Sequence, residues 1–308
     1  MKHLYFWAAV LWSALPVIAQ QDAQYNLYQF NQMIINPAYA GARDGLSVIA
    51  AMRQQWSGFD GAPQTTCLSM HAPVLKNKLG IGMTIVSDKM GPRDVIGAYA
   101  NVAYILKLSQ EAKLHFGVNA GYNRYQFHYS DLKFKNEEAP PEVYQNQNIG
   151  TLDINGGLFF RMKSFFLGVS ATHLNDENLY TFSANNSDSG KVSYKLHMHI
   201  FGTIGKSWQC GENLVFAPTL LVKQVKGTVG VDVNMNFFIY KKLWLGAFYR
   251  YGYGPGGLLQ YYVTNRFKVG YSYDSGLNDA RRLGGSHEVM LGLDFSGTKA
   301  TIINPRFL

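Results

Sequence analysis

The chain has 308 residues and a formal net charge of +8, and only 16% of its residues are charged. It contains 31 Gly, 20 Tyr and 19 Phe, a composition typical of a β-protein with crowded turns and aromatic girdles. After the N-terminal leader no run of eighteen apolar residues occurs, which excludes a bundle of transmembrane helices.

The N-terminus has the features of a secretory leader. Lys2 precedes an apolar stretch from Leu4 to Leu15, and residues 17–19 have the small-residue spacing of a signal-peptidase site. We therefore expect residues 1–19 to be a signal peptide and the mature protein to begin near Gln20.

Residues 20–44 precede the first expected strand. Asn36-Pro37 favours a turn, because proline restricts the residue before it, and Gly41 permits backbone angles that other residues avoid. We expect this segment to lie on the periplasmic side or to fold into the lumen of a barrel. Two interpretations are equally favoured: a plug or docking segment, and a turn that merely launches the first strand.

Strict alternation of apolar and polar residues dominates the chain from residue 45 to residue 296. Strands that separate lipid from a polar lumen need this pattern, because successive side chains point to opposite faces. The stretches 192–200 and 228–239 are clear examples. They predict a lumen lined by polar side chains, including Lys195, His197, Asp232, Asn234 and Asn236.

The sequence predicts an all-β protein, a transmembrane antiparallel β-barrel of about fourteen strands over residues 45–296, followed by a tail over 297–308. The strands are expected near 45–56, 63–73, 78–88, 94–108, 112–128, 151–162, 163–174, 191–206, 212–224, 227–240, 241–250, 257–265, 266–274 and 287–296. Their connections alternate between short and long, as expected for short periplasmic turns and longer external loops. A soluble β-sandwich, the alternative fold, predicts neither this rhythm nor a leader.

Two groups of side chains fall at the expected strand ends. The expected periplasmic rim is basic: Lys76, Lys78, Lys107, Lys113, Arg161, Lys163, Lys206, Lys241, Lys242 and Arg266. A ring of positive charge attracts acidic protein surfaces or anionic polymer, although contact with lipid headgroups and solubility explain it equally well. The external end carries a second cluster, interpreted as a site for an exported partner or as loop packing: Arg53, Trp56, Phe59, Asp60, Arg281 and Arg282.

The sequence predicts no catalytic site, metal site or cofactor. His197 and His199 share a strand face, but two ligands do not complete a zinc site, and no nucleophile motif accompanies the histidines. The basic residues are dispersed, so nucleic acid is not an expected partner. Cys67 and Cys210 are too few for a disulfide framework, and whether they pair stays open.

Several short motifs, none specific alone, recur in a familiar order. They are Gln24-Tyr25, Gln29-Phe30-Asn31, Asn36-Pro37-Ala38-Tyr39-Ala40-Gly41, Arg53-Gln54-Gln55-Trp56, Gly61-Ala62-Pro63-Gln64-Thr65, Gly80-Ile81-Gly82, Asp88, Gly91-Pro92 and Pro305-Arg306-Phe307. In order and spacing they resemble the PorP/SprF family of type IX secretion and gliding-motility membrane proteins. The final Leu308 departs from the aromatic residue that the family favours.

That resemblance implies a non-enzymatic barrel in the bacterial outer membrane. Its expected partners are outer-membrane lipids and either periplasmic components of the secretion or gliding apparatus or secreted surface proteins. A passive porin or hydrophobic-solute channel is the main alternative, and an enzyme ranks third.

Overall fold

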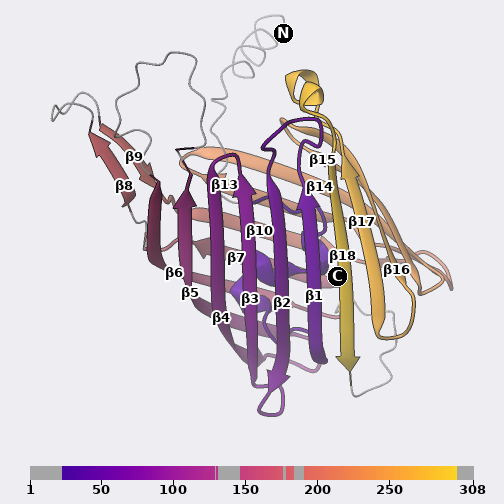
Figure 1. Cartoon of the computed structure of the whole chain (residues 1–308). Coiled ribbons are helices and arrows are strands. Elements are labelled where there is room, and N and C mark those ends of the chain that lie inside the picture. The colour runs from indigo at the N-terminus through magenta and orange to yellow at the C-terminus, as the bar shows by residue number, and fades with distance from the viewer. Residues whose placement is uncertain (1–22, 129, 131–145, 176–177, 184–190, 297–308) are drawn as a thin grey trace, which may run out of the picture.

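The computed structural model describes residues 23–128, 130, 146–175, 178–183 and 191–296 (Figure 1). The expected signal peptide and the C-terminal tail lie outside these residues. Apart from short 3-10 turns, the described elements are all β-strands. None of the helices in these ranges is long and apolar enough to span a membrane.

Fourteen strands form one closed antiparallel barrel, as predicted. Each strand pairs with its sequence neighbours along the wall, and β1 closes the ring against the last strand, with Gly45 opposite Ser296. The strands of the wall are β1 (Gly45–Gln54), β2 (Gln64–Val74), β3 (Leu79–Met90), β4 (Arg93–Lys107), β5 (Lys113–Phe127), β6 (Gln147–Arg161), β7 (Phe165–Thr172), β10 (His199–Lys206), β13 (Thr219–Val225), β14 (Thr228–Ile239), β15 (Leu243–Arg250), β16 (Gly254–Tyr262), β17 (Phe267–Asp274) and β18 (Ser286–Ser296).

Two expected strands are interrupted. Residues 191–206 do not form one strand, because β9 (Lys191–Lys195) pairs with β8 (Asn178–Ser183) in a separate hairpin and only β10 belongs to the wall. Alternation is the same in a hairpin and in a wall, so it could not separate the two. The expected strand 212–224 is split into β12 (Leu214–Phe216) and β13 at Pro218, which lacks a backbone N–H for the ladder. The small β11 (Trp208–Gln209) pairs with β12.

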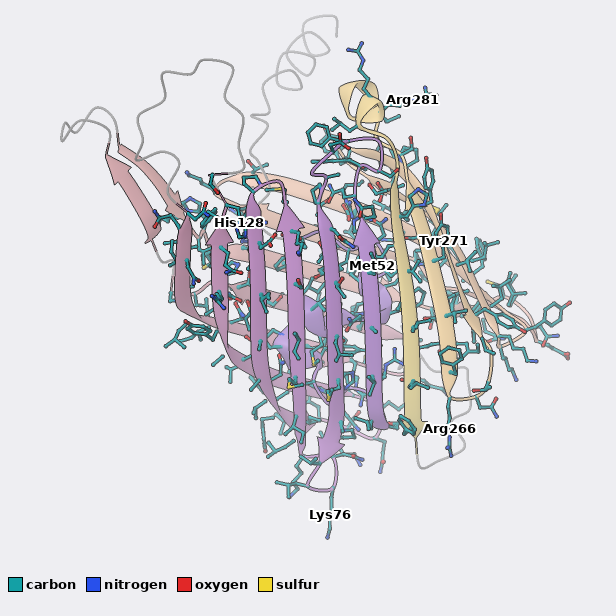
Figure 2. All side chains as sticks on the ribbon, viewed as in Figure 1. Met52, Lys76, His128, Arg266, Tyr271 and Arg281 are labelled. Atoms are coloured by element: carbon teal, nitrogen blue, oxygen red, sulfur yellow. The ribbon has the colours of Figure 1, made fainter. Side chains whose placement is uncertain are left out.

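Side chains alternate across the wall as the sequence predicts. On β5, Phe116 and Val118 point outward and are 43% and 61% exposed. His115, the residue before Phe116, points inward and is buried. Apolar side chains cover much of the outer surface, including Met52 and the aromatic Tyr271 (Figure 2). This outer surface suits contact with hydrocarbon.

The two ends of the barrel differ. The short-turn end carries the tight connections 75–78, 108–112, 162–164, 240–242 and 263–266 and one longer connection, 207–218, which contains β11 and β12. The loop end carries the longer connections 55–63, 128–146, 173–198 and 275–285 and the tight turns 91–92, 226–227 and 251–253. Figure 2 shows Lys76 and Arg266 at the short-turn end and His128 and Arg281 at the loop end.

The interior is a packed core rather than the aqueous lumen that the alternation predicted. Asp232, Asn234 and Asn236 do point inward. Large apolar side chains point inward beside them, however, and pack with the N-terminal segment: Ile49, Phe159, Phe166, Phe238, Trp244, Phe248, Leu258 and Met290. The alternating pattern identifies polar residues that point inward, but it does not show which apolar residues also point inward.

Candidate functional site

Residues 23–44, here called the lumen segment, lie within the ring of strands (Figure 1). They form three 3-10 turns, η1 (Tyr28–Phe30), η2 (Gln32–Ile34) and η3 (Pro37–Tyr39). The Asn36 side chain begins η3 by accepting a hydrogen bond from the Ala38 amide at 2.9 Å, and Pro37 supplies the restricted φ of the first position. The turn expected at Asn36-Pro37 is therefore present, and it is buried.

Inward-facing glycines on three strands make room for η3 and the residues after it. A Cβ on Gly80 would lie 2.0 Å from the Ala40 carbonyl oxygen, and one on Gly117 would lie 2.2 Å from the Ala38 Cα. A Cβ on Gly157 would lie 2.2 Å from the Asn36 side chain. The backbone of the lumen segment thus contacts the backbone of the wall directly, with no space between them.

Polar contacts continue this packing through the middle of the barrel. Gln29 accepts hydrogen bonds from Asn236 at 2.9 Å and from Thr219 at 3.2 Å. Asn31 accepts one from the Ser69 hydroxyl at 2.7 Å. These partners sit on β14, β13 and β2, so the segment is held from opposite sides of the wall.

A first ionic cluster fixes the segment at the loop end. The backbone amide of Asn26 donates to Glu288 at 2.6 Å. The Arg53 guanidinium lies 2.8 Å from Asp274 and 3.5 Å from Glu288. Arg53 is 1% exposed, so for this residue the partner-surface interpretation, one of the two given for its cluster, is wrong. It lies on the inward parity of β1, where it neutralises two buried carboxylates.

Arg250 extends this cluster. Its guanidinium binds both carboxylate oxygens of Asp232 at 2.8–3.0 Å. It also donates hydrogen bonds to the side-chain oxygens of Gln24 at 2.7 Å and Asn26 at 3.3 Å. Two wall arginines therefore hold the beginning of the lumen segment. The sequence showed Arg250 only as a strand position, because Gln24 and Asn26 lie more than two hundred residues away from it in the chain.

A second ionic cluster fixes the segment at the short-turn end. Arg43 lies 2.9 Å from Asp294, and Lys268 reaches the same carboxylate at 2.7 Å. The Ser47 hydroxyl donates to the other oxygen of Asp294 at 2.7 Å. One carboxylate on β18 thus joins β1, β17 and the end of the lumen segment.

Most of the expected basic rim is exposed at the short-turn end: Lys76, Lys78, Lys107, Lys163, Lys206, Lys241, Lys242 and Arg266. Lys206 also lies over the Trp208 ring, 5.0 Å from its centroid. Arg161 is a correction, because it is 7% exposed and its Nε donates to His115 at 3.3 Å. It is the last residue of β6 and keeps the inward parity of that strand.

The loop-end cluster is partly assembled. The Ser57 amide donates to the Gly285 carbonyl at 2.9 Å, and the Gly58 amide donates to the Leu283 carbonyl at 3.3 Å. These bonds join the β1–β2 loop, which carries Trp56, Phe59 and Asp60, to the β17–β18 loop, which carries Arg281 and Arg282. Phe59 remains 56% exposed.

Tyr253 lies at the same end. Its hydroxyl is 3.2 Å from Ser286 Oγ, and burial raises the pKa of this tyrosine. A protonated hydroxyl keeps its capacity to donate a hydrogen bond.

The histidines do not form a metal site in the part of the chain that the structure describes. His173 pairs with Asp153 at 3.0 Å, and His199 Nδ1 lies 2.8 Å from the His197 carbonyl oxygen. Cys67 is buried and Cys210 is exposed, and they are not bonded to each other.

Comparison with known proteins identifies the family. The sequence from residue 17 to residue 293 matches the family described as type IX secretion system membrane protein PorP/SprF. The chain belongs to this family. A search of curated proteins found no match.

Solved structures with the same kind of barrel include two hydrocarbon-transport proteins. The toluene transporter TbuX of Ralstonia pickettii aligns with a TM-score of 0.53 at 10% identity over 86% of this chain and 94% of that one. The CymD monoaromatic hydrocarbon channel gives the same score and identity over 86% and 93%. At this identity the likeness shows the fold alone.

Family and fold together establish a type IX secretion membrane protein of the bacterial outer membrane. Membership in this PorP/SprF family implies association with other secretion machinery. The family and the similar structures are secretion and transport barrels.

Proposed function

We propose that this PorP/SprF protein is a closed anchor in the outer membrane. It links periplasmic machinery of the type IX secretion or gliding apparatus to that membrane, or holds secreted surface proteins there, and it does not conduct solutes. The observation that supports this function is the lumen segment, which fills the barrel with backbone contacts and two ionic clusters. A solute channel needs an open path, whereas an anchor gains rigidity from a filled interior.

The short-turn end is the proposed contact surface for a periplasmic partner. Its exposed lysines and Arg266 outnumber the acids at the same end, chiefly Glu111 and Glu212. Such a surface favours an acidic protein and accelerates its association through long-range attraction. The loops at the opposite end then face the cell exterior, as short periplasmic turns and longer external loops require.

Affinity capture tests which end binds the partner. The intact protein is compared with a Lys241→Glu/Lys242→Glu variant at the short-turn end and with a matched Arg281→Glu/Arg282→Glu variant at the loop end, each captured from gently solubilised envelopes. We expect the first variant to lose a periplasmic component that the second retains. Loss of a surface protein by the second variant alone assigns the surface-anchoring role instead, and no loss by either refutes both proposed surfaces.

Planar-bilayer recordings test the closed state. The purified protein is expected to be silent under conditions in which a porin, used as the positive control, gives steady currents. A steady current from the intact protein would instead support the passive channel.

A further inference from the structure

The lumen segment crosses the barrel in one direction. Its first contacts are with Arg250, the last residue of β15, and with Glu288, the third residue of β18. The Asn26 side chain also donates to Asp274, the last residue of β17. All three wall residues lie where their strands meet the loop end.

The rest of the segment descends from there. Asn31 bonds to Ser69 midway along β2, and Arg43 bonds to Asp294 near the end of β18. β1 then starts at Gly45, opposite Ser296, at the short-turn end. The chain therefore enters from the loop end and finishes at the end from which the first strand rises.

Burial follows the same order. Residues 23–25 are half-buried, and burial becomes complete at Asn26, which is 1% exposed. The exposure of the first described residues matches a chain that emerges from the mouth of the barrel at the loop end.

We propose that the lumen segment begins at the loop end, so that Ala23 and Arg281 lie on one side of the membrane and Lys76 on the other. With the orientation given under Proposed function, on which this statement rests, residues 23–25 lie at the cell-surface mouth of the barrel. An end at the short-turn side would have to abandon the hydrogen bonds from Asn26 to Glu288 and Asp274, two buried carboxylates that also pair with Arg53. At this mouth the half-buried residues 23–25 are within reach of an exported partner.

Cysteine labelling tests the proposal. Cys210, which is exposed, is replaced by serine, and Cys67 is kept because it is buried. Ala23→Cys, Arg281→Cys and Lys76→Cys are introduced singly, and a membrane-impermeant polyethylene-glycol maleimide is added to intact and to permeabilised cells. Heat-modifiable migration on gels verifies that each variant is folded.

We expect a gel shift for Ala23→Cys and Arg281→Cys in intact cells, and for Lys76→Cys only after permeabilisation. The proposal is overturned if Ala23→Cys follows Lys76→Cys, and not Arg281→Cys, in whether its labelling requires permeabilisation. It is also overturned if Ala23→Cys labels in neither preparation. Ala23→Cys and Arg281→Cys could instead both require permeabilisation while Lys76→Cys labels in intact cells. That result would support the placement of Ala23 and Arg281 on one side of the membrane, and it would refute the orientation of the barrel given under Proposed function.

Discussion

Gly80 offers a direct test of how tightly the lumen segment fits. A Cβ at this position would lie 2.0 Å from the oxygen and 2.4 Å from the carbon of the Ala40 carbonyl group. The two backbones would have to separate by about 1.4 Å, the difference between the shorter distance and the 3.4 Å of ordinary contact. Overpacking by one methyl group costs about 1–3 kcal/mol, and Gly80→Ala is expected at the upper end because neither contacting atom belongs to a flexible side chain.

The measurement is the midpoint of chemical unfolding in detergent micelles, followed by tryptophan fluorescence. Gly202→Ala on β10 is the matched control, because a Cβ there meets no atom within 4 Å, and its effect should stay within about 0.5 kcal/mol. Equal unfolding midpoints for the two variants would refute the direct backbone contact.

Three further predictions concern the wall. Arg53→Met should destabilise the barrel by about 3–5 kcal/mol, because it leaves the carboxylates of Asp274 and Glu288 buried without their cation; adding Glu288→Gln should recover part of the loss in the unfolding midpoint, and no recovery would contradict the pairing. Trp244→Ala should cost about 3–5 kcal/mol by removing a buried ring from the interior, and an unchanged midpoint would place that ring outside the core. Val118→Arg should lower the free energy of unfolding in lipid vesicles by about 2–4 kcal/mol, and the control Val118→Leu should lower it much less. Equal folding yields for the two variants would mean that this face does not meet hydrocarbon.

The wall was predictable from sequence because its physics is local. Alternation along β14 separates Val233 and Met235 from Asn234 and Asn236, and the structure exposes the first pair and buries the second. Strand boundaries followed from the same pattern to within about four residues, except where Pro218 interrupted the ladder and where residues 191–195 left the wall. Neither exception changes the alternation itself.

The interior was not predictable because its contacts are distant in sequence. Asn26 and Glu288 are 262 positions apart, and nothing near Arg53 in the chain indicates two carboxylates beside it. The glycines of the wall were one available signal. Gly80 and Gly117 point inward, and a lumen lined by water would not need glycine at these positions. Their common purpose becomes visible only when the strands are aligned in register.

The two ionic clusters share β18, which supplies Glu288 to one and Asp294 to the other. While the barrel folds, the contacts of the lumen segment with Glu288 and Asp294 wait for the final strand, although earlier strands already supply other partners. Contacts between residues so far apart in the chain form slowly, so a folding barrel completes both ionic clusters only when the seam between β18 and β1 is made. Chains truncated before β18 would therefore combine an open seam with two incomplete ionic clusters, which makes them natural targets for envelope proteases.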